Sequence, residues 1–225
     1  MFIISETCKT TYPGAVAGIL VMRNVSNPSY HLVLDRHKDE LELRLRSRFA
    51  GQDRADLKAL KPIQVYSNYF KRYKKTYPVQ LQFESVVFKG KSISRAAALV
   101  ETMFMAELKN LLLTAGHDLE AIRTPIRLEI SKGGERYLGL NRQEQELKSG
   151  DMMMVDGQGI ISSVLYGPDC RTQITPATKH VLFAVYAPPG IGEQEVYQHL
   201  QDLRYNVLLV APEAEVELQR TYSAE

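Results

Sequence analysis

The sequence LLLTAGHDLEAI, residues 111–122, decides the fold class, because a helical pattern changes to a strand pattern within it. Before this stretch, residues 95–115 carry apolar side chains on nearly every helical face, which predicts a helix buried on more than one side. We expect Ser92 or Ser94 to cap the start of this helix. Gly116 is expected to end it in the left-handed conformation that glycine tolerates.

Short apolar runs separated by turn sequences follow the helix. The runs are PIRLEIS, YLGL, DMMMV, IISSVLY and VLFAVYA, and the turns are KGGE, KSGD and DGQG. This spacing predicts a meander or sandwich of strands, including a hairpin in DMMMVDGQGIISSV that uses Gly157 and Gly159 for its turn. Together with the helix, these strands place the chain in the α+β class.

Apolar periodicity predicts the remaining elements. AVAGILVM, residues 15–22, is a continuous apolar run typical of a buried strand. Residues 38–60 have the pattern of two short helices, and residues 63–76 that of a third. A further helix is expected from near Gly192, and VLLVAP after it has the pattern of a strand.

Composition bounds the class of protein. The 225 residues are 44% hydrophobic and 24% charged, which excludes disordered and disulfide-scaffold proteins, and we expect one domain over residues 1–225. A net charge of +2 leaves no whole-molecule field for nonspecific nucleic-acid binding, so any RNA contact must be local. Cys8 and Cys170 are far apart, which suits free thiols in the cytoplasm. The start of the chain predicts no membrane or export role.

Common catalytic signatures do not occur. The sequence contains no nucleophile elbow, no phosphate-binding loop, no HExxH motif and no Cys/His cluster with zinc spacing. We therefore expect neither a metal nor a cofactor. His31 and His37 are placed in a polar loop and His199 in an amphipathic helix, and all three are interpreted as structural.

Residues 63–76 also carry a candidate RNA-binding surface. Lys71, Arg72, Lys74 and Lys75 alternate with tyrosine and phenylalanine, a combination that binds nucleic-acid backbone and bases. The alternative is a solvated helix whose tyrosines pack inward, which is the commoner situation for charged helical surfaces.

Three polar groups are further candidates for binding. His117 precedes Asp118 in a turn, where it either contacts a ligand or serves the turn itself. Glu144 and Glu146 share one face of a strand, either for accepting a hydrogen bond from a substrate or as an exposed edge. The loop GPDCRTQIT holds polar groups that either bind an anion or order the loop; they are Asp169, Arg171, Thr172 and Thr175.

From about Tyr69 to Pro189, the order of these motifs resembles the central editing domain of the phenylalanyl-tRNA synthetase β subunit, and in particular free-standing proteins built on that domain. The motifs are AGHDLEAI, PIRLEISKGGERYLGLNRQEQELKSGDMMMVDGQG and TQITPAT. The resemblance implies a layered β-sandwich-like core with flanking helices. It also implies hydrolysis of a wrongly esterified aminoacyl-tRNA, in which a polar group reads the extra hydroxyl of tyrosine. Residues 1–64 lie outside this core.

The resemblance also assigns residues. The family's substrate-reading glutamate falls on Glu144, and Ser162 and Ser163 fall near the small residues of its pocket. The family has an asparagine on the long helix and a proline and histidine just after it. This chain has Phe104 and residues 113–115 at those places. We include His117 and Thr175 with these as substrate-binding candidates.

Three functions are consistent with this reading. The first is a stand-alone protein that binds or hydrolyses mischarged aminoacyl-tRNA, with tRNA as its partner. The second is a non-catalytic module that binds tRNA, RNA or a small ligand on the same fold, which the departures from the family pattern favour. The third is a small-molecule enzyme or sensor, since a fold does not determine function.

Overall fold

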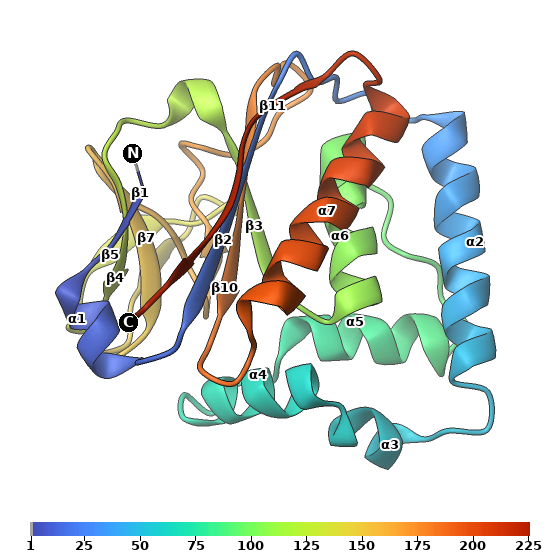
Figure 1. The fold of residues 1–225 in the computed structure, drawn as a ribbon, viewed down its shortest axis with the longest axis horizontal. Helices are drawn as coiled ribbons and strands as arrows, with labels where there is room; N and C mark the ends of the chain where they lie inside the picture. The colour runs from blue at the N-terminus through green and yellow to red at the C-terminus, as the bar shows by residue number, and fades with distance from the viewer. Residues whose placement is uncertain (1) are drawn as a thin grey trace.

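Two β-sheets face each other in the computed structural model, which describes residues 2–225 (Figure 1). The five-stranded sheet has the order β1-β4-β7-β8-β9, and the four-stranded sheet has the order β11-β2-β10-β3. The first sheet contains β1 (Phe2–Ile4), β4 (Ile126–Ile130), β7 (Met152–Asp156), β8 (Gly159–Ser163) and β9 (Gly167–Pro168). The second contains β2 (Val16–Arg23), β3 (Thr114–Asp118), β10 (Val181–Ala187) and β11 (Glu215–Ser223).

The central strands of the four-stranded sheet are buried on both faces. All of β10 and all of β2 except Arg23 are buried, as expected for strands covered on one face by helices and on the other by a second sheet. The prediction of a buried strand at residues 15–22 is therefore confirmed. The remaining strands, β5 (Arg136–Leu138) and β6 (Glu144–Glu146), form a separate two-stranded ribbon.

Helices cover the outer face of the four-stranded sheet (Figure 1). α6 (Ala98–Asn110) and α7 (Glu193–Val210) pack on each other, and α2 (Leu32–Arg48) packs outside them. α7 approaches the sheet closely at Gly18, where an added Cβ would lie 2.5 Å from Val196 Cγ1. Glycine in β2 therefore sets the distance between this helix and the sheet.

The shorter helices lie at the periphery. α3 (Arg54–Ala59), α4 (Lys61–Lys71) and α5 (Pro78–Val87) cross one end of the molecule, and α1 (Glu6–Thr11) follows β1 (Figure 1). A single 3₁₀ turn, η1 (Leu119–Ala121), follows β3. The helix predicted at residues 63–76 is confirmed as far as Lys71, where α4 ends; residues 72–76 form a turn and not a helix. Of the two helices predicted within residues 38–60, the first begins earlier, at Leu32, so His31 is its N-cap and His37 lies inside it.

The structure corrects both ends of the long helix. α6 begins after Ala97, whose side chain cannot cap it, so neither Ser92 nor Ser94 is the cap. It ends at Leu111, which adopts the left-handed conformation with φ 59°, because the buried side chain holds this residue in the core. Gly116 instead lies in β3, where an added Cβ would meet Ile174 Cδ1 at 2.7 Å.

Two expectations for the C-terminal half have different outcomes. The hairpin in DMMMVDGQGIISSV is confirmed as β7 and β8; of the two glycines expected in its turn, Gly159 has a positive φ and Gly157 does not. The strand expected in VLLVAP is wrong, because Val207 and Val210 continue the buried stripe of α7 at helical spacing. Within residues 2–225, no helix combines the length and apolarity needed to cross a membrane.

Candidate functional site

A pocket lies beside the edge strand β3, where the two sheets approach each other. In the part of the chain that the structure describes, β3 pairs with one strand only, β10, and its other edge lies toward β9 and the segment before it. The cavity has a volume of about 280 Å³. We call it the edge pocket, and its lining residues are Pro78, Leu113, Thr114, Ala115, Ser163, Val164, Leu165, Tyr166, Gly167 and Tyr186.

The lining of the edge pocket is mostly apolar, with a few hydroxyl groups. Ser163 Oγ accepts a hydrogen bond from the N–H of Tyr166 at 3.1 Å. The hydroxyl of Tyr186 is hydrogen-bonded to Ser162, and burial raises the pKa of Tyr186, so that it stays a neutral phenol. An apolar pocket with a few hydroxyl groups suits a ligand that is mostly apolar and carries a small number of uncharged polar groups.

A buried carboxyl group lies behind the wall formed by residues 163–166. Asp151 Oδ1 accepts a hydrogen bond from the Tyr69 hydroxyl at 2.7 Å, and the same hydroxyl accepts from the N–H of Met152. Burial raises the pKa of Asp151 to about 6, although the Tyr69 hydroxyl and Ser163 favour its ionised form. Asp151 thus links α4 to the start of β7 and to the pocket wall.

Other ionisable groups hold β3 from the opposite side of the sheet. The N–H of Thr114 donates to Glu107 Oε1 at 2.8 Å, and Thr114 Oγ1 lies 2.7 Å from His199 Nε2. The amide of Asn110 donates to Nδ1 of this histidine, so Nε2 carries the hydrogen. Burial raises the pKa of Glu107 to about 8 and lowers that of His199 to about 4. Both groups are therefore neutral near neutral pH, and His199 is structural as expected.

A second, polar hollow of about 500 Å³ lies next to the edge pocket. We call it the basic cleft, and it is lined by Lys58, Gln64, Ser67, Asn68, Lys71, Lys75, Thr76, Tyr77 and Gln80. Lys75 Nζ lies 4.3 Å from the ring centroid of Tyr166, which lines the edge pocket. Tyr77 and Pro78 are consecutive residues on the two linings, so the hollows adjoin.

The structure divides the four predicted RNA-binding residues. Lys71 and Lys75 line the basic cleft, whereas Lys74 has a left-handed conformation and does not line it. The guanidinium of Arg72 lies 4.7 Å from the ring centroid of Tyr69 and also stacks on two further tyrosines. Within residues 2–225, no acidic side chain pairs with the three cleft lysines, which are thus available to an anion.

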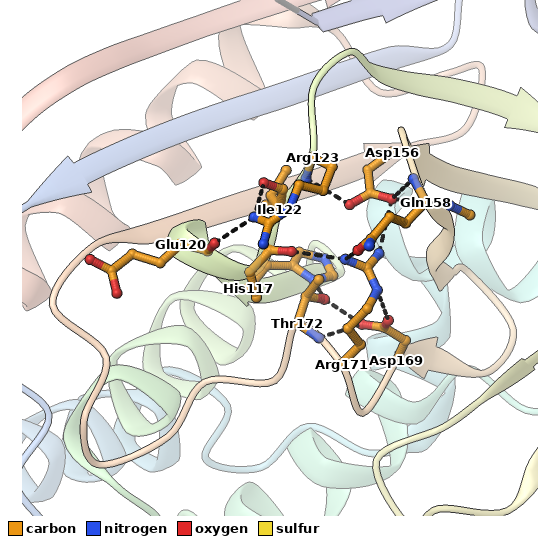
Figure 2. A network of polar contacts seen from close by, with 11 residues as sticks. His117, Glu120, Ile122, Arg123, Asp156, Gln158, Asp169, Arg171 and Thr172 are labelled. Atoms are coloured by element: carbon orange, nitrogen blue, oxygen red, sulfur yellow. Dashed lines mark hydrogen bonds and ion pairs between the residues drawn. The ribbon is translucent and has the colours of Figure 1, made fainter.

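His117 lies at the far end of β3, in a buried polar network (Figure 2). Its Nδ1 lies 2.8 Å from Thr172 Oγ1, and this hydroxyl in turn donates to Asp169, so Nδ1 is the donor to threonine. Burial, with a smaller contribution from Arg171, lowers the pKa of His117 to about 3. The imidazole is neutral and does not line the edge pocket.

Arg171 occupies the centre of the same network (Figure 2). It donates to the carbonyl of Ala121 at 2.8 Å and to Gln158 at 3.0 Å, and it pairs with Asp156 at 2.9 Å. Burial alone would raise the pKa of Asp156, but backbone N–H donors and Arg171 hold it below its ordinary value. Because these groups satisfy one another, the interpretation that they order the loop is the better supported one.

The other predicted site residues lie apart from the edge pocket. Glu144 is exposed on the β5–β6 ribbon and is paired with Arg136 at 3.1 Å, on the same face as Glu146. Thr175 lies in a turn, where its Oγ1 accepts from the N–H of Ala177. Of the five substrate-binding candidates, Ser163 alone lines the edge pocket, and Ser162 contacts it through Tyr186.

Sequence reasoning missed most of the pocket wall. Ala115 and Tyr186 sit on buried strands, and apolar or small residues in such strands carry no signal of a cavity. Asp151, where the turn KSGD meets the run DMMMV, carries no signal of a buried carboxyl group in the sequence. Glu107 had a usable signal, since a carboxylate on a helix that is apolar on nearly every face must be buried and perturbed.

Comparison with known families identifies the fold. A family model described as B3/4 domain matches residues 64–201, which is more than half of the chain. The chain belongs to the B3/4 domain family. The matched residues of this B3/4 chain include every residue of the edge pocket and all of the basic cleft except Lys58. The resemblance inferred from the sequence motifs, and with it the α+β class, is confirmed.

Two further comparisons were made. Among solved structures, the B3/4 chain is similar to the crystal structure of an N-terminal fragment of the phenylalanyl-tRNA synthetase β subunit from Pyrococcus horikoshii, with 13% identity and a TM-score of 0.49. The match covers 98% of this chain and 53% of that one, so the chain spans about half the length of the fragment. No curated protein matches the sequence.

Proposed function

We propose that this B3/4 protein binds the aminoacylated 3′ end of a tRNA. In this proposal the aminoacyl group enters the edge pocket and the adjacent phosphates contact the lysines of the basic cleft. The observation that carries it is the junction of the two hollows, where Lys75 lies on the ring of Tyr166. Membership of the family that is typified by synthetase editing domains supports the same class of ligand.

Size and charge support this division of labour. A cavity of about 280 Å³ is on the scale of one amino acid. It is too small to hold an amino acid and a nucleotide together. The lysines of the neighbouring cleft have no acidic partners within residues 2–225, so phosphates meet unneutralised cations there. With a net charge of only +2, the contact is confined to this surface.

Two outcomes of binding are distinguished. Hydrolysis of the ester would use a water positioned by the substrate and by the backbone of the pocket, where the N–H groups of Leu113 and Thr114 already donate to Tyr66 and Glu107. Binding without turnover is the second candidate. It is favoured by the edge-pocket lining, which contains no histidine and no carboxylate within the part of the chain described.

The experiment measures binding and deacylation over a panel of correctly and wrongly charged tRNAs. We expect binding by the native protein, and loss of binding in the double variant Lys71→Glu, Lys75→Glu. Ala115→Leu, which narrows the edge pocket, should weaken binding of charged tRNA while leaving binding of uncharged tRNA unchanged. Lys132→Glu is the matched control, because Lys132 is exposed and lies outside the cleft.

The same panel decides the reaction and the role of Glu144. Release of the amino acid by the native protein establishes a deacylase, and binding without release establishes the non-catalytic module. Recognition of the amino acid by Glu144 stays a prediction. It is tested by comparing how Glu144→Ala and Ala115→Leu change the binding and deacylation of the charged tRNAs. Failure of every charged tRNA to bind would overturn the proposal and leave a small-molecule function.

A further inference from the structure

A third cavity, of about 560 Å³, opens between the two sheets on the side away from β3. We call it the sandwich cleft. Its residues come from β1, β2, β4, β10, β11 and the segment between β3 and β4, and it shares none of them with the edge pocket. They are Phe2, Ile19, Val21, Arg23, Leu119, Ile122, Thr124, Ile126, Leu182, Glu217, Leu218, Arg220 and Tyr222.

The floor of the sandwich cleft is apolar. Ile19 and Val21 of β2 and Leu182 of β10 are buried there, and Ile126 of β4 faces them from the other sheet. β11 is the edge strand of its sheet, and its Leu218, in register with Val21, is only half-buried. The five-stranded sheet therefore leaves the inward face of β11 incompletely covered.

The rim of the sandwich cleft carries one unbalanced charge. Arg23 and Glu217 form an ion pair and neutralise each other. Arg220, on the same face of β11 as Leu218, stacks on Tyr222 at 5.2 Å and pairs with no acidic side chain within residues 2–225. A guanidinium that stacks on an aromatic ring keeps its N–H groups available. It can then donate two parallel hydrogen bonds to one carboxylate.

We propose that the sandwich cleft binds a free carboxylate with an extended apolar body, of the fatty-acid type. Its chain lies between Leu182, Leu218 and Ile126, and its carboxylate meets Arg220. Charge complementarity selects an anion, and the apolar floor selects a ligand whose remaining part is uncharged. The volume lies within the range of small-ligand sites, and this site is separate from the proposed tRNA surface.

The test titrates decanoate into the full-length protein, below its micellar concentration, by calorimetry. We expect saturable one-to-one binding. Decanol, which has the same chain and no charge, should bind roughly tenfold or more weakly, because the charge-assisted hydrogen bonds to Arg220 are lost. Arg220→Gln should weaken decanoate to a similar degree and leave decanol unchanged. Arg204→Gln, an exposed arginine on α7, should behave as native.

A second variant, Leu218→Trp, fills the cleft and should abolish binding of both ligands, with thermal unfolding reporting whether the fold survives. Absence of decanoate binding by the native protein would overturn the proposal, as would equal binding of decanoate by native and Arg220→Gln protein. So would a dimer, seen by light scattering, that Leu218→Trp dissociates, because a second copy would then occupy the cleft. Loss of tRNA binding alone bears only on the proposed function.

Discussion

The two ends of strand β3 are covered in opposite ways. At its C-terminal end, Asp118 donates its N–H to the carbonyl of Thr172, and the loop that follows β9 closes over the strand. At its N-terminal end, residues 113–115 line the edge pocket, and no strand within residues 2–225 pairs with them on that side. One short strand thus has a closed polar end and an open apolar end.

The comparison shows that polar side chains which stabilise the fold and a cavity which can bind a ligand lie at different ends of β3. At the closed end, His117, Asp169 and Arg171 use their polar groups on one another and on backbone carbonyls. At the open end, the N–H groups of Leu113 and Thr114 are engaged by Tyr66 and Glu107, but the cavity remains free for a ligand. A cluster of polar residues therefore marks the end of β3 that stabilises the fold. The candidate binding surface lies at the other end, beside the cavity.

The largest effect on stability is expected when the polar network at the closed end of β3 is broken. Arg171→Ala leaves the fully buried side chain of Asp156 without its cation, and we expect a loss of about 3 kcal/mol in the free energy of unfolding. Urea unfolding measures it. Arg36→Ala, at an exposed position on α2, is the control. A loss no larger than that of the control would mean that the network does not stabilise the fold.

The next largest effect is a pH dependence of stability that comes from Glu107, whose carboxyl group contacts the open end of β3. Glu107 keeps its proton up to about pH 8 in the folded chain, whereas in the unfolded chain it is ionised above about pH 4.5. The stabilisation contributed by Glu107 is therefore fully present below about pH 4.5 and falls as pH rises toward 8, by about 1.4 kcal/mol per pH unit. The window from pH 7 to 8 reports mainly on Glu107, because the buried histidines His117 and His199 gain protons on unfolding only below about their ordinary pKa of 6.5, and Asp151 titrates lower still.

Glu107→Gln should abolish this slope, since the amide does not titrate. Chemical unfolding at several pH values between 7 and 8 provides the measurement. Glu40→Gln, an exposed change on α2, should keep the slope. An identical slope in native and Glu107→Gln protein would contradict the assignment of this proton.

A smaller loss of stability is expected when one hydrogen-bonding group is removed from the closed end of β3. Thr172→Val preserves shape but removes the hydroxyl that accepts from His117 and donates to Asp169, so we expect a loss of about 1.5 kcal/mol in the free energy of unfolding. Thr175→Val in the same loop removes only an acceptor at the surface and should have less effect. Equal losses would show that the buried chain of hydrogen bonds has no special contribution.

The smallest effect is expected on the ribbon. Glu144→Gln breaks an exposed ion pair with Arg136, while Glu146 still pairs with the same arginine. The unfolding midpoint should therefore stay within experimental error of the native value. A clear shift would indicate that the ribbon contributes to stability in a way that its exposure does not suggest.

The regular parts of the fold were predictable from local pattern. The apolar run at residues 15–22 and the glycine-turned hairpin at Asp156–Gly159 have strong signals, and both formed as expected. The end of α6 was not predictable, because burial of Leu111 overrides the preference for glycine in a left-handed conformation. The extension of α7 through Val210 likewise depends on packing against the sheet.

The candidate site was less predictable for a physical reason. Motif reasoning finds polar side chains, and it found Ser163, Lys71 and Lys75, which line the two adjoining hollows. It could not find Ala115 or Tyr186, because a cavity depends on which surfaces fail to meet in three dimensions. It also could not show that Nδ1 of His117 is engaged, since its partner Thr172 lies more than fifty residues away.

The abrupt passage from α6 to β3, through Leu111–Leu113 alone, has a consequence for changes in chain length. Neighbouring residues of a strand face opposite sides of its sheet, so one residue inserted there would turn His117 toward the helices and Gly116 toward the other sheet. The polar network and the edge pocket would be lost together. Insertions and deletions at this junction should therefore be far less tolerated than those in the exposed turn between β5 and β6.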